Sequence, residues 1–312
     1  MKARPHLQMG EGAEFDAIRQ MLAAWGAGAL GIGDDAAVLD VPSGERLVVS
    51  TDATVEHVHF RREWLTAEEI GGRAGAAALS DLAAMAANPL GLLLALGLPD
   101  NWRSELESLA RGLGVVAAAA GCPIVGGNVS AAGELSLTIT VLGSTTQPLS
   151  RSGALAGDII YVTGRLGGAG AALRALLDGR EASAEHRARF VAPVPRVREA
   201  RWLAVCGARA AIDISDGLLA DASHLARASG VTLSLQPLQI PRMSGVSIED
   251  AATSGEEYEL LVAAPPSAGV RADEFEREFG IPLTAIGVAT APGSEAVVGL
   301  RAVRSSGHDH LG

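Results

Sequence analysis

Lysine is almost absent from this sequence: among its 312 residues, Lys2 is the only one. A P-loop and the nucleotide site of a protein kinase each need a lysine, and so does Schiff-base chemistry. A lysine at the second position is poorly placed for any of these roles. If the protein handles phosphate, we therefore expect arginine, backbone N–H groups or metal ions to bind it.

Cysteine and long apolar runs are also scarce. Cys122 and Cys206 are far apart and form no Cys-x-x-Cys pair, so neither a zinc site nor a disulfide framework is indicated, as suits a reducing cytoplasm. The first ten residues lack the apolar core of a signal peptide. The longest apolar stretch, 82–98, is interrupted by Asn88-Pro89, so we expect a cytoplasmic protein with no membrane contact.

The charge balance is acidic, with 25 basic against 36 acidic residues and a net charge of −11. Such a surface disfavours nucleic-acid binding and is compatible with binding cations, or phosphates through bridging cations. Hydrophobic residues make up 48% of the chain, enough for a substantial core. Short β-rich runs alternate with helical stretches, which predicts an α+β protein with two domains, at 1–147 and 148–312.

Apolar periodicity and turn residues predict the main elements. Strands are expected at 47–50, 90–98, 134–143, 158–163, 231–235, 258–263 and 283–288. Helices are expected at 67–87, 102–120, 167–178, 197–206 and 272–279. Thr66 and Glu69 are spaced as a capping box for one helix, and Asp216 is expected to be the N-cap of another that ends near Ala228.

Many acidic residues lie at turns beside Gly, Ser or Thr, a pattern typical of oxygen-ligand metal sites. Such clusters occur at 31–35, 50–52, 80–81, 213–217 and 255–258. Adjacent carboxylates repel one another, and divalent cations relieve that repulsion. Magnesium uses one or two carboxylates together with substrate phosphates, while glycine lets backbone N–H groups approach a phosphate. The sequence therefore predicts several magnesium ions around the phosphates of a nucleotide.

Each cluster taken alone also has a purely structural interpretation. Residues 31–35 could be a solvated turn, 50–52 a strand end, and 213–217 a helix N-terminus. Asp81 could be an exposed helical residue, and the C-terminal residues 307–310 could be a tail. The order of the clusters along the chain is more informative than any one of them.

Seven segments in this order resemble the thiamine-monophosphate kinase family, part of the aminoimidazole ribonucleotide synthetase-like superfamily. They are GIGDDAAVL, STDATVEHVHF, ALSDLAAMAANP, IVGGN, RSGALAGDIIYVTG, AIDISDGLLAD and SGEEYELL, and the resemblance extends over about 14–311. It implies two α/β domains, with a mixed N-terminal sheet that forms a barrel across the two-fold axis of a homodimer. It also implies transfer of phosphate from ATP to thiamine monophosphate, giving thiamine diphosphate and ADP. Because the acceptor would be an anionic phosphate oxygen that needs no general base, we expect direct in-line transfer.

The resemblance also implies a role for each matching residue. Magnesium ligands are expected at Asp35, Ser50, Thr51, Asp52, Asp81, Asn128, Asp213 and Asp216. Contacts to ATP are expected from Gly127, Asn128, Arg151 and Ser215, and contacts to thiamine monophosphate from His59, Glu256 and His308.

The sequence departs from the family pattern at four positions. Asn128 replaces a metal-ligating aspartate, Glu257 stands where aspartate is usual, Ser254 replaces glycine, and His308 replaces an aromatic residue. An uncharged amide predicts weaker magnesium binding at Asn128. Two alternatives remain open: a related ATP-dependent enzyme with another acceptor, and a nucleotide-binding protein without catalytic activity.

Overall fold

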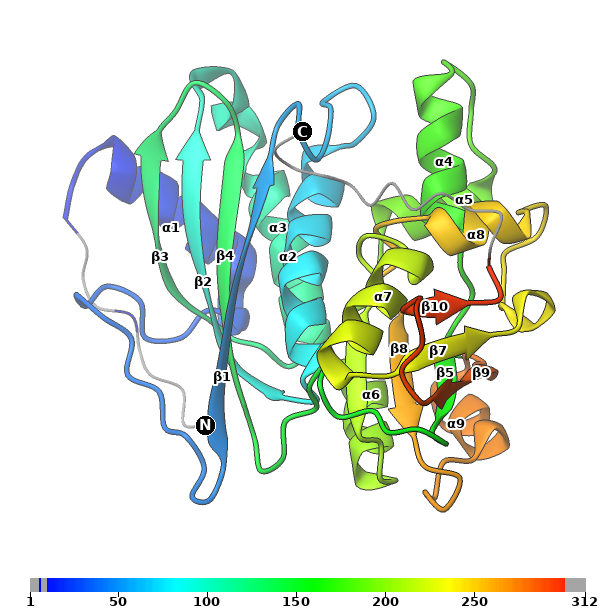
Figure 1. Cartoon of the computed structure of the whole chain (residues 1–312). Coiled ribbons are helices and arrows are strands. Elements are labelled where there is room, and N and C mark those ends of the chain that lie inside the picture. Colours follow the sequence, from blue (N-terminus) through cyan, green and yellow to red (C-terminus); the bar gives the residue numbers. More distant parts are fainter. Residues whose placement is uncertain (1–5, 7–9, 301–312) are drawn as a thin grey trace. The chain divides into compact units, whose positions relative to one another are not determined.

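The structure is a computed structural model that describes His6 and residues 10–300. The chain forms two compact units, Met1–Leu82 with Ala87–Thr146, and Ala83–Ala86 with Gln147–Gly312. Each unit is built around one β-sheet flanked by helices (Figure 1). The predicted architecture of two α/β domains is therefore confirmed.

The first unit contains a four-stranded mixed sheet with the order β1-β4-β2-β3. Strands β1 and β2 both pair antiparallel with β4, and β3 pairs parallel with β2. The helices and strands are α1 (Ala13–Trp25), β1 (Arg46–Val55), α2 (Ala67–Ala84), β2 (Asn88–Leu98), α3 (Leu106–Ala119), β3 (Ile124–Ala131) and β4 (Ser136–Thr145), with 3-10 turns at Gly26–Gly28 and Asp100–Glu105.

Helices α1, α2 and α3 lie against one face of this sheet (Figure 1). Helices α2 and α3 approach closely because they meet at glycines: a Cβ on Gly71 would lie 2.0 Å from the carbonyl oxygen of Leu109. The opposite face is exposed along β1, and it is apolar in the first half of the strand, where Leu47 and Val49 are 51% and 55% exposed. The alternation along β1 therefore separates a helix-covered face from an open one.

The second unit contains a six-stranded sheet with the order β10-β7-β9-β5-β8-β6. Only β10 and β7 pair in parallel; the other neighbours are antiparallel. The elements are β5 (Ile159–Thr163), α4 (Gly168–Leu177), α5 (Ala184–Val191), α6 (Val197–Val205), β6 (Ala210–Asp213), α7 (Leu218–Ser229), β7 (Thr232–Leu235), a 3-10 turn at Pro237–Gln239, α8 (Ile248–Thr253), β8 (Leu260–Ala264), α9 (Ala272–Phe279), β9 (Leu283–Thr290) and β10 (Val297–Val298).

Both faces of this sheet are buried, so its central strands are apolar on each side. In β6, Ala210 and Ile212 join the core that includes Leu218 and Leu225 of α7. The intervening Ala211 joins the other core, which includes Phe275 of α9. The all-apolar run that precedes Asp213 thus delivers that carboxylate to the end of a fully buried strand.

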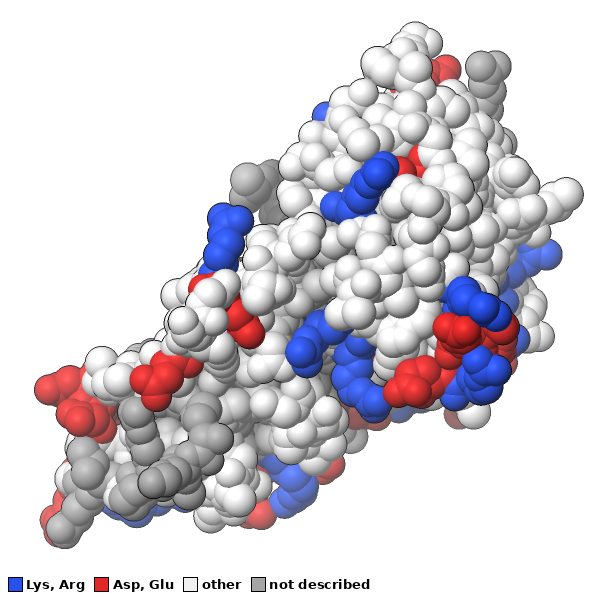
Figure 2. Space-filling view, turned by 90° about the horizontal axis from the view of Figure 1, so that it is seen from below, with Lys and Arg blue, Asp and Glu red and all other residues white. Residues whose placement is uncertain are grey.

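Several predicted boundaries differ from the structure. Strand β1 continues through the polar residues 50–52 to Val55, because its pairing with β4 is uninterrupted. The helix expected at 102–120 begins as a 3-10 turn and becomes α-helical only at Leu106. Among the described residues, no helix is long and apolar enough to cross a membrane. On the face shown in Figure 2, basic side chains lie beside acidic ones.

Candidate active site

In the first unit, Ser50 and Asp52 alternate with Thr51 along β1. Ser50 pairs with Val141 and Asp52 with Ile139, both buried, so these two side chains lie on the helix-covered face. Thr51 lies on the open face, where its Oγ1 is 3.1 Å from Oγ1 of Thr140. The side chains of the Ser-Thr-Asp segment therefore point to both faces of the sheet.

Asp81 reaches the same face from helix α2. The Ser50 hydroxyl donates a hydrogen bond of 2.5 Å to Oδ2 of Asp81, which links two residues 31 positions apart. Asp81 lies close to the C-terminus of α2, whose last turn carries no basic residue. The helix dipole is negative there, so it disfavours a carboxylate and favours a cation beside it.

The structure does not bring the side chain of Asn128 to these oxygens. Asn128 is exposed and pairs with Ala95 on β2, one residue beyond the pair of Gly127 with Leu94. Leu94 also pairs with Ile139, the partner of Asp52. Gly127 thus shares a row with Asp52, and the next side chain, that of Asn128, projects from the opposite face.

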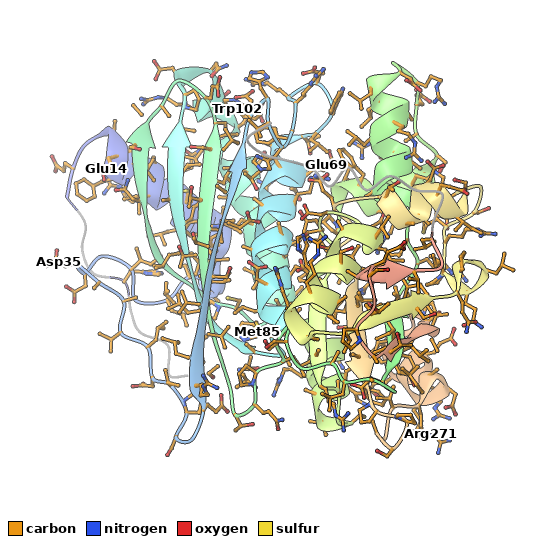
Figure 3. The ribbon with its side chains drawn as sticks, in the orientation of Figure 1. Glu14, Asp35, Glu69, Met85, Trp102 and Arg271 are labelled. Carbon is orange, nitrogen blue, oxygen red and sulfur yellow. The ribbon has the colours of Figure 1, made fainter. Side chains whose placement is uncertain are left out.

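Gly127 itself is required by the close approach of β2 and β3. A Cβ at this position would lie 1.9 Å from the carbonyl oxygen of Leu94. Asp35, by contrast, stays apart: it is exposed on the long loop before β1, where its N–H donates to Oδ1 of Asp34. Figure 3 shows Asp35 projecting outward at the far left of the view, from the loop that precedes β1.

His59 lies in the turn that follows β1. The N–H of Val55 donates to Nδ1 of His59 over 3.1 Å, and the N–H of His59 donates to the carbonyl oxygen of Val55 over 2.9 Å. Because Nδ1 is an acceptor, the neutral imidazole carries its proton on Nε2. The turn therefore fixes His59 as an Nε2–H donor.

Glu56, which the sequence did not single out, anchors this turn. Its carboxylate is buried and accepts hydrogen bonds from Nε1 of Trp102 at 2.9 Å and from the N–H of Leu135 at 3.2 Å. Its sequence signal was weak, since a single glutamate beside two histidines looks like any exposed turn residue.

In the second unit, the acidic segment Asp213-Ile214-Ser215-Asp216-Gly217 links β6 to α7. Asp213 is buried, whereas Ser215 and Asp216 are half-buried. The prediction that Asp216 is the N-cap of this helix is wrong. Gly217 occupies that position, and its φ of 117° is one that residues with side chains rarely adopt.

Asp221, four residues after Gly217, takes the hydrogen-bonding role expected of the N-cap. Its Oδ2 accepts hydrogen bonds of 3.1 Å from the N–H groups of Ser215, Asp216 and Gly217. Burial raises the pKa of Asp221 to about 8, and the neighbouring carboxylates of Asp213 and Asp216 add to the rise. An acidic residue in the first turn of a helix that starts at glycine was the signal that could have identified it.

Glu256 is held directly against this segment in an unusual backbone conformation. Glu256 and Tyr258 have φ values of 57° and 51°, and such left-handed residues cost about 1–3 kcal/mol each. The N–H of Glu256 donates to the carbonyl oxygen of Ser215 at 2.7 Å, and that of Tyr258 to Ile214 at 2.9 Å. Strain of this kind clusters at functional sites.

Two of the four departures from the family pattern contact each other. The hydroxyl of Ser254 donates to Oε1 of Glu257 at 2.5 Å, and the same oxygen accepts from the N–H groups of Gly167 and Ala169 at the start of α4. Burial raises the pKa of Glu257. Ser254 also accepts from the N–H of Gly170 at 2.9 Å. These side chains therefore fasten the Glu256 segment to α4.

The remaining predicted residues are less constrained. Arg151 is exposed, and its carbonyl oxygen accepts a hydrogen bond of 2.7 Å from the hydroxyl of Ser229. His308 lies outside the described residues.

The donor atoms in both units suit magnesium. Within the described residues, no three His, Cys, Asp or Glu side chains are close enough to form a metal cluster by themselves. Magnesium does not require one, because it binds through one or two carboxylates together with waters and substrate phosphates. The pair of Ser50 and Asp81 beside the negative end of α2 fits that description, and so do the crowded carboxylates of Asp213 and Asp216.

Comparison with known proteins finds family models and relatives that match most of this chain. Two family models match it: AIR synthase related protein, N-terminal domain, over residues 33–145, and AIR synthase related protein, C-terminal domain, over residues 156–299. A thiamine-monophosphate kinase of Salmonella typhimurium is 34% identical over 304 residues, which cover 90% of this chain and 91% of the relative.

Solved structures are similar over nearly the whole chain. A thiamine-monophosphate kinase from Stenotrophomonas maltophilia has a TM-score of 0.81 and 34% identity, and the match covers 93% of this chain and 97% of the other. AaThiL complexed with AMPPCP and TMP has a TM-score of 0.73 and 30% identity, with 91% of each chain covered.

Proposed function

Because the chain belongs to the thiamine-monophosphate kinase family, we propose that it transfers the terminal phosphate of ATP to thiamine monophosphate. The products are thiamine diphosphate and ADP. The observation that carries this proposal is similarity over nearly the full length, including a relative complexed with AMPPCP and TMP.

The chemistry of the acceptor explains why the chain needs no lysine and no general base. The attacking group is a phosphate oxygen that is already anionic near neutral pH. The barrier lies instead in the repulsion and alignment of two anionic phosphates. Direct in-line transfer without a phosphoenzyme follows from this, and an acid-stable phosphoprotein formed in a rapid burst would contradict it.

The oxygen donors of each unit are the proposed magnesium ligands. In the first unit they are Ser50, Asp52 and Asp81, and in the second Asp213 and Asp216. Magnesium, when bound, neutralises the repulsion between the phosphates and aligns them. The open-face positions of Thr51 and Asn128, and the remote position of Asp35, support a smaller contribution from their side chains.

The other proposed contacts come from groups whose orientation is already set. His59 donates Nε2–H to a phosphate oxygen of thiamine monophosphate, and Glu256 contacts the same substrate. Gly127 lets the backbone of β3 approach ATP, and Ser215 and Arg151 bind ATP with their side chains. The tautomer of His59 supports its role, because an N–H donor suits an anionic phosphate.

We also propose that the protein acts as a homodimer in the cytoplasm. The open face of the first unit's sheet supports the dimer, since Leu47 and Val49 expose apolar surface in the first half of β1. Two free cysteines are compatible with a reducing compartment. Analytical ultracentrifugation of the protein, with Val49→Glu as a variant, tests the dimer: a wild-type monomer would contradict it.

The test of function is to incubate the protein with ATP, magnesium and thiamine monophosphate and to measure thiamine diphosphate. Product that EDTA abolishes and added magnesium restores is the expected result. Binding of ATP without product over a range of magnesium concentrations would contradict the proposal and favour a nucleotide-binding protein without activity. Turnover of ATP with other phosphorylated acceptors but not this one would favour a related enzyme.

A further inference from the structure

We propose that Asp221 is a positioning residue that holds two parts of the active site in one arrangement. These parts are the segment carrying Ser215 and Asp216, and the strained segment carrying Glu256. The inference rests on the function proposed above for those residues, but its geometry lies entirely within the second unit.

The first step is the contact that Asp221 makes with the loop. One carboxylate oxygen accepts hydrogen bonds from three consecutive N–H groups, those of Ser215, Asp216 and Gly217. Asp221 is only 2% exposed and belongs to the first turn of α7. Three bonds from a rigid, buried side chain fix the peptide planes of the loop, and with them the directions in which Ser215 and Asp216 project.

The second step leads from that loop to the other segment. The carbonyl oxygens of the same loop accept hydrogen bonds from the strained residues. The carbonyl oxygen of Ser215 accepts from the N–H of Glu256, and that of Ile214 accepts from the N–H of Tyr258. Gly255 packs so closely that a Cβ there would lie 2.8 Å from the carbonyl oxygen of Ser215. The conformation of Glu256 therefore depends on the loop that Asp221 holds.

The third step concerns what Asp221 excludes. Consecutive N–H groups at the start of a helix ordinarily form a binding site for phosphate. Here the site is filled by a carboxylate of the chain itself, so a phosphate cannot use these N–H groups without displacing Asp221. At this loop a phosphate is then bound through the side chains of Ser215 and Asp216, which is consistent with a site that relies on carboxylates and cations.

The experiment compares Asp221→Asn and Asp221→Ala with Asp158→Asn. Asp158 is a matched control because it is 1% exposed, lies in the same unit, accepts an N–H from Leu155 at 2.8 Å and pairs with Arg209. It has no proposed role in the site. Each full-length variant is examined by circular dichroism, by hydrogen exchange with mass spectrometry, and by steady-state kinetics with varied ATP, thiamine monophosphate and magnesium.

For Asp221→Ala we expect faster amide exchange in peptides covering 213–217 and also in those covering 255–258. We expect its kcat/KM for both substrates to fall at least about tenfold, because small displacements of aligned groups are costly. Asp221→Asn keeps one oxygen that can accept the three N–H groups, so its exchange rates and kinetic constants should lie between those of Asp221→Ala and wild type. Formate, which can refill the vacated position, should restore part of the activity and protection of Asp221→Ala. Asp158→Asn should lose stability and exchange faster near Leu155, with kinetic constants within about twofold of wild type.

Three results would overturn the inference. The first is wild-type exchange at 255–258 in both Asp221 variants, which would show that the two segments are not coupled. The second is wild-type kinetic constants in folded Asp221 variants. The third is global unfolding of both Asp221 variants while Asp158→Asn stays folded, because that result would make Asp221 a general structural residue. If the wild-type protein makes no thiamine diphosphate, the proposed function fails, and the exchange data still decide the positioning role.

Discussion

Replacing His59 with asparagine or with glutamine distinguishes the roles of its two ring nitrogens. An asparagine amide lies where Nδ1 lies, so its oxygen can still accept the N–H of Val55, but the Nε2–H donor is lost. A glutamine amide reaches the position of Nε2 and retains a donor there, but it gives up the acceptor that closes the turn. The pair therefore tests whether the turn exists to aim Nε2–H at the substrate.

The expected magnitudes follow from the two bonds. A hydrogen bond to a charged group contributes about 1.5–3 kcal/mol, so losing a bond to the phosphate in His59→Asn should lower kcat/KM roughly 10- to 150-fold. The bond of 3.1 Å from Val55 to Nδ1 joins uncharged groups and should be worth about 1 kcal/mol of unfolding free energy. His59→Gln should therefore lose stability while it keeps more activity than His59→Asn.

The assay measures kcat/KM for thiamine monophosphate at saturating ATP, together with urea unfolding of each variant. The KM for ATP should stay within about twofold of wild type in both variants, since His59 is proposed to contact only the acceptor. Wild-type efficiency in His59→Asn would refute the reasoning, and so would an equal loss in the two variants at unchanged stability.

Three further predictions concern single positions. Gly127→Ala should lower the free energy of unfolding in urea by at least about 1–3 kcal/mol, because the new Cβ would meet backbone atoms. Gly126→Ala is the control, since a Cβ there would lie 3.0 Å from the movable Cδ2 of Leu93. Equal losses of stability in the two alanine variants would contradict this prediction. Asn128→Asp should leave the half-saturating magnesium concentration unchanged, because the side chain of residue 128 projects from the open face; a lower requirement in this variant would return Asn128 to the metal site. Burial raises the pKa of Cys122 to about 12, so at pH 8 Ellman's reagent should leave it unmodified until guanidinium is added; rapid reaction of Cys122 in the native protein, identified by mass spectrometry, would be the contrary result.

The sequence predicted those features whose causes are local. Helix α9 has the predicted bounds, and the capping box is present, with the N–H of Thr66 donating to Glu69 at 2.9 Å and the N–H of Glu69 donating to Thr66 at 3.2 Å. The strand Ile124–Ala131 was not predicted, because its Gly-Gly-Asn segment has low β-propensity and is stabilised by pairing with β2. Tertiary pairing of this kind leaves little local signal.

The site was predictable in composition but not in arrangement. A series of acidic turns indicated oxygen ligands, yet no local pattern shows that Ser50 donates to Asp81 across 31 residues. Nor does a pattern reveal which face of β1 each side chain occupies until the register with β4 is known. Asp216 was mistaken for the N-cap because its type and position suit that role, whereas the bonds were made by Asp221 from inside the helix.

Helices α7 and α2, one in each unit, carry a carboxyl group at opposite ends of the helix dipole. Asp221 lies at the N-terminal end of α7, where the dipole is positive and three N–H groups satisfy one oxygen. Asp81 lies near the C-terminal end of α2, where the dipole is negative and the last turn has no basic residue. Hydrogen bonds from the chain itself hold the carboxyl group of Asp221, while an external cation best compensates the charge of Asp81. Removing the charge in Asp81→Asn should therefore stabilise the magnesium-free protein while weakening magnesium binding. These two opposite effects distinguish a carboxylate that binds metal from one with a structural role.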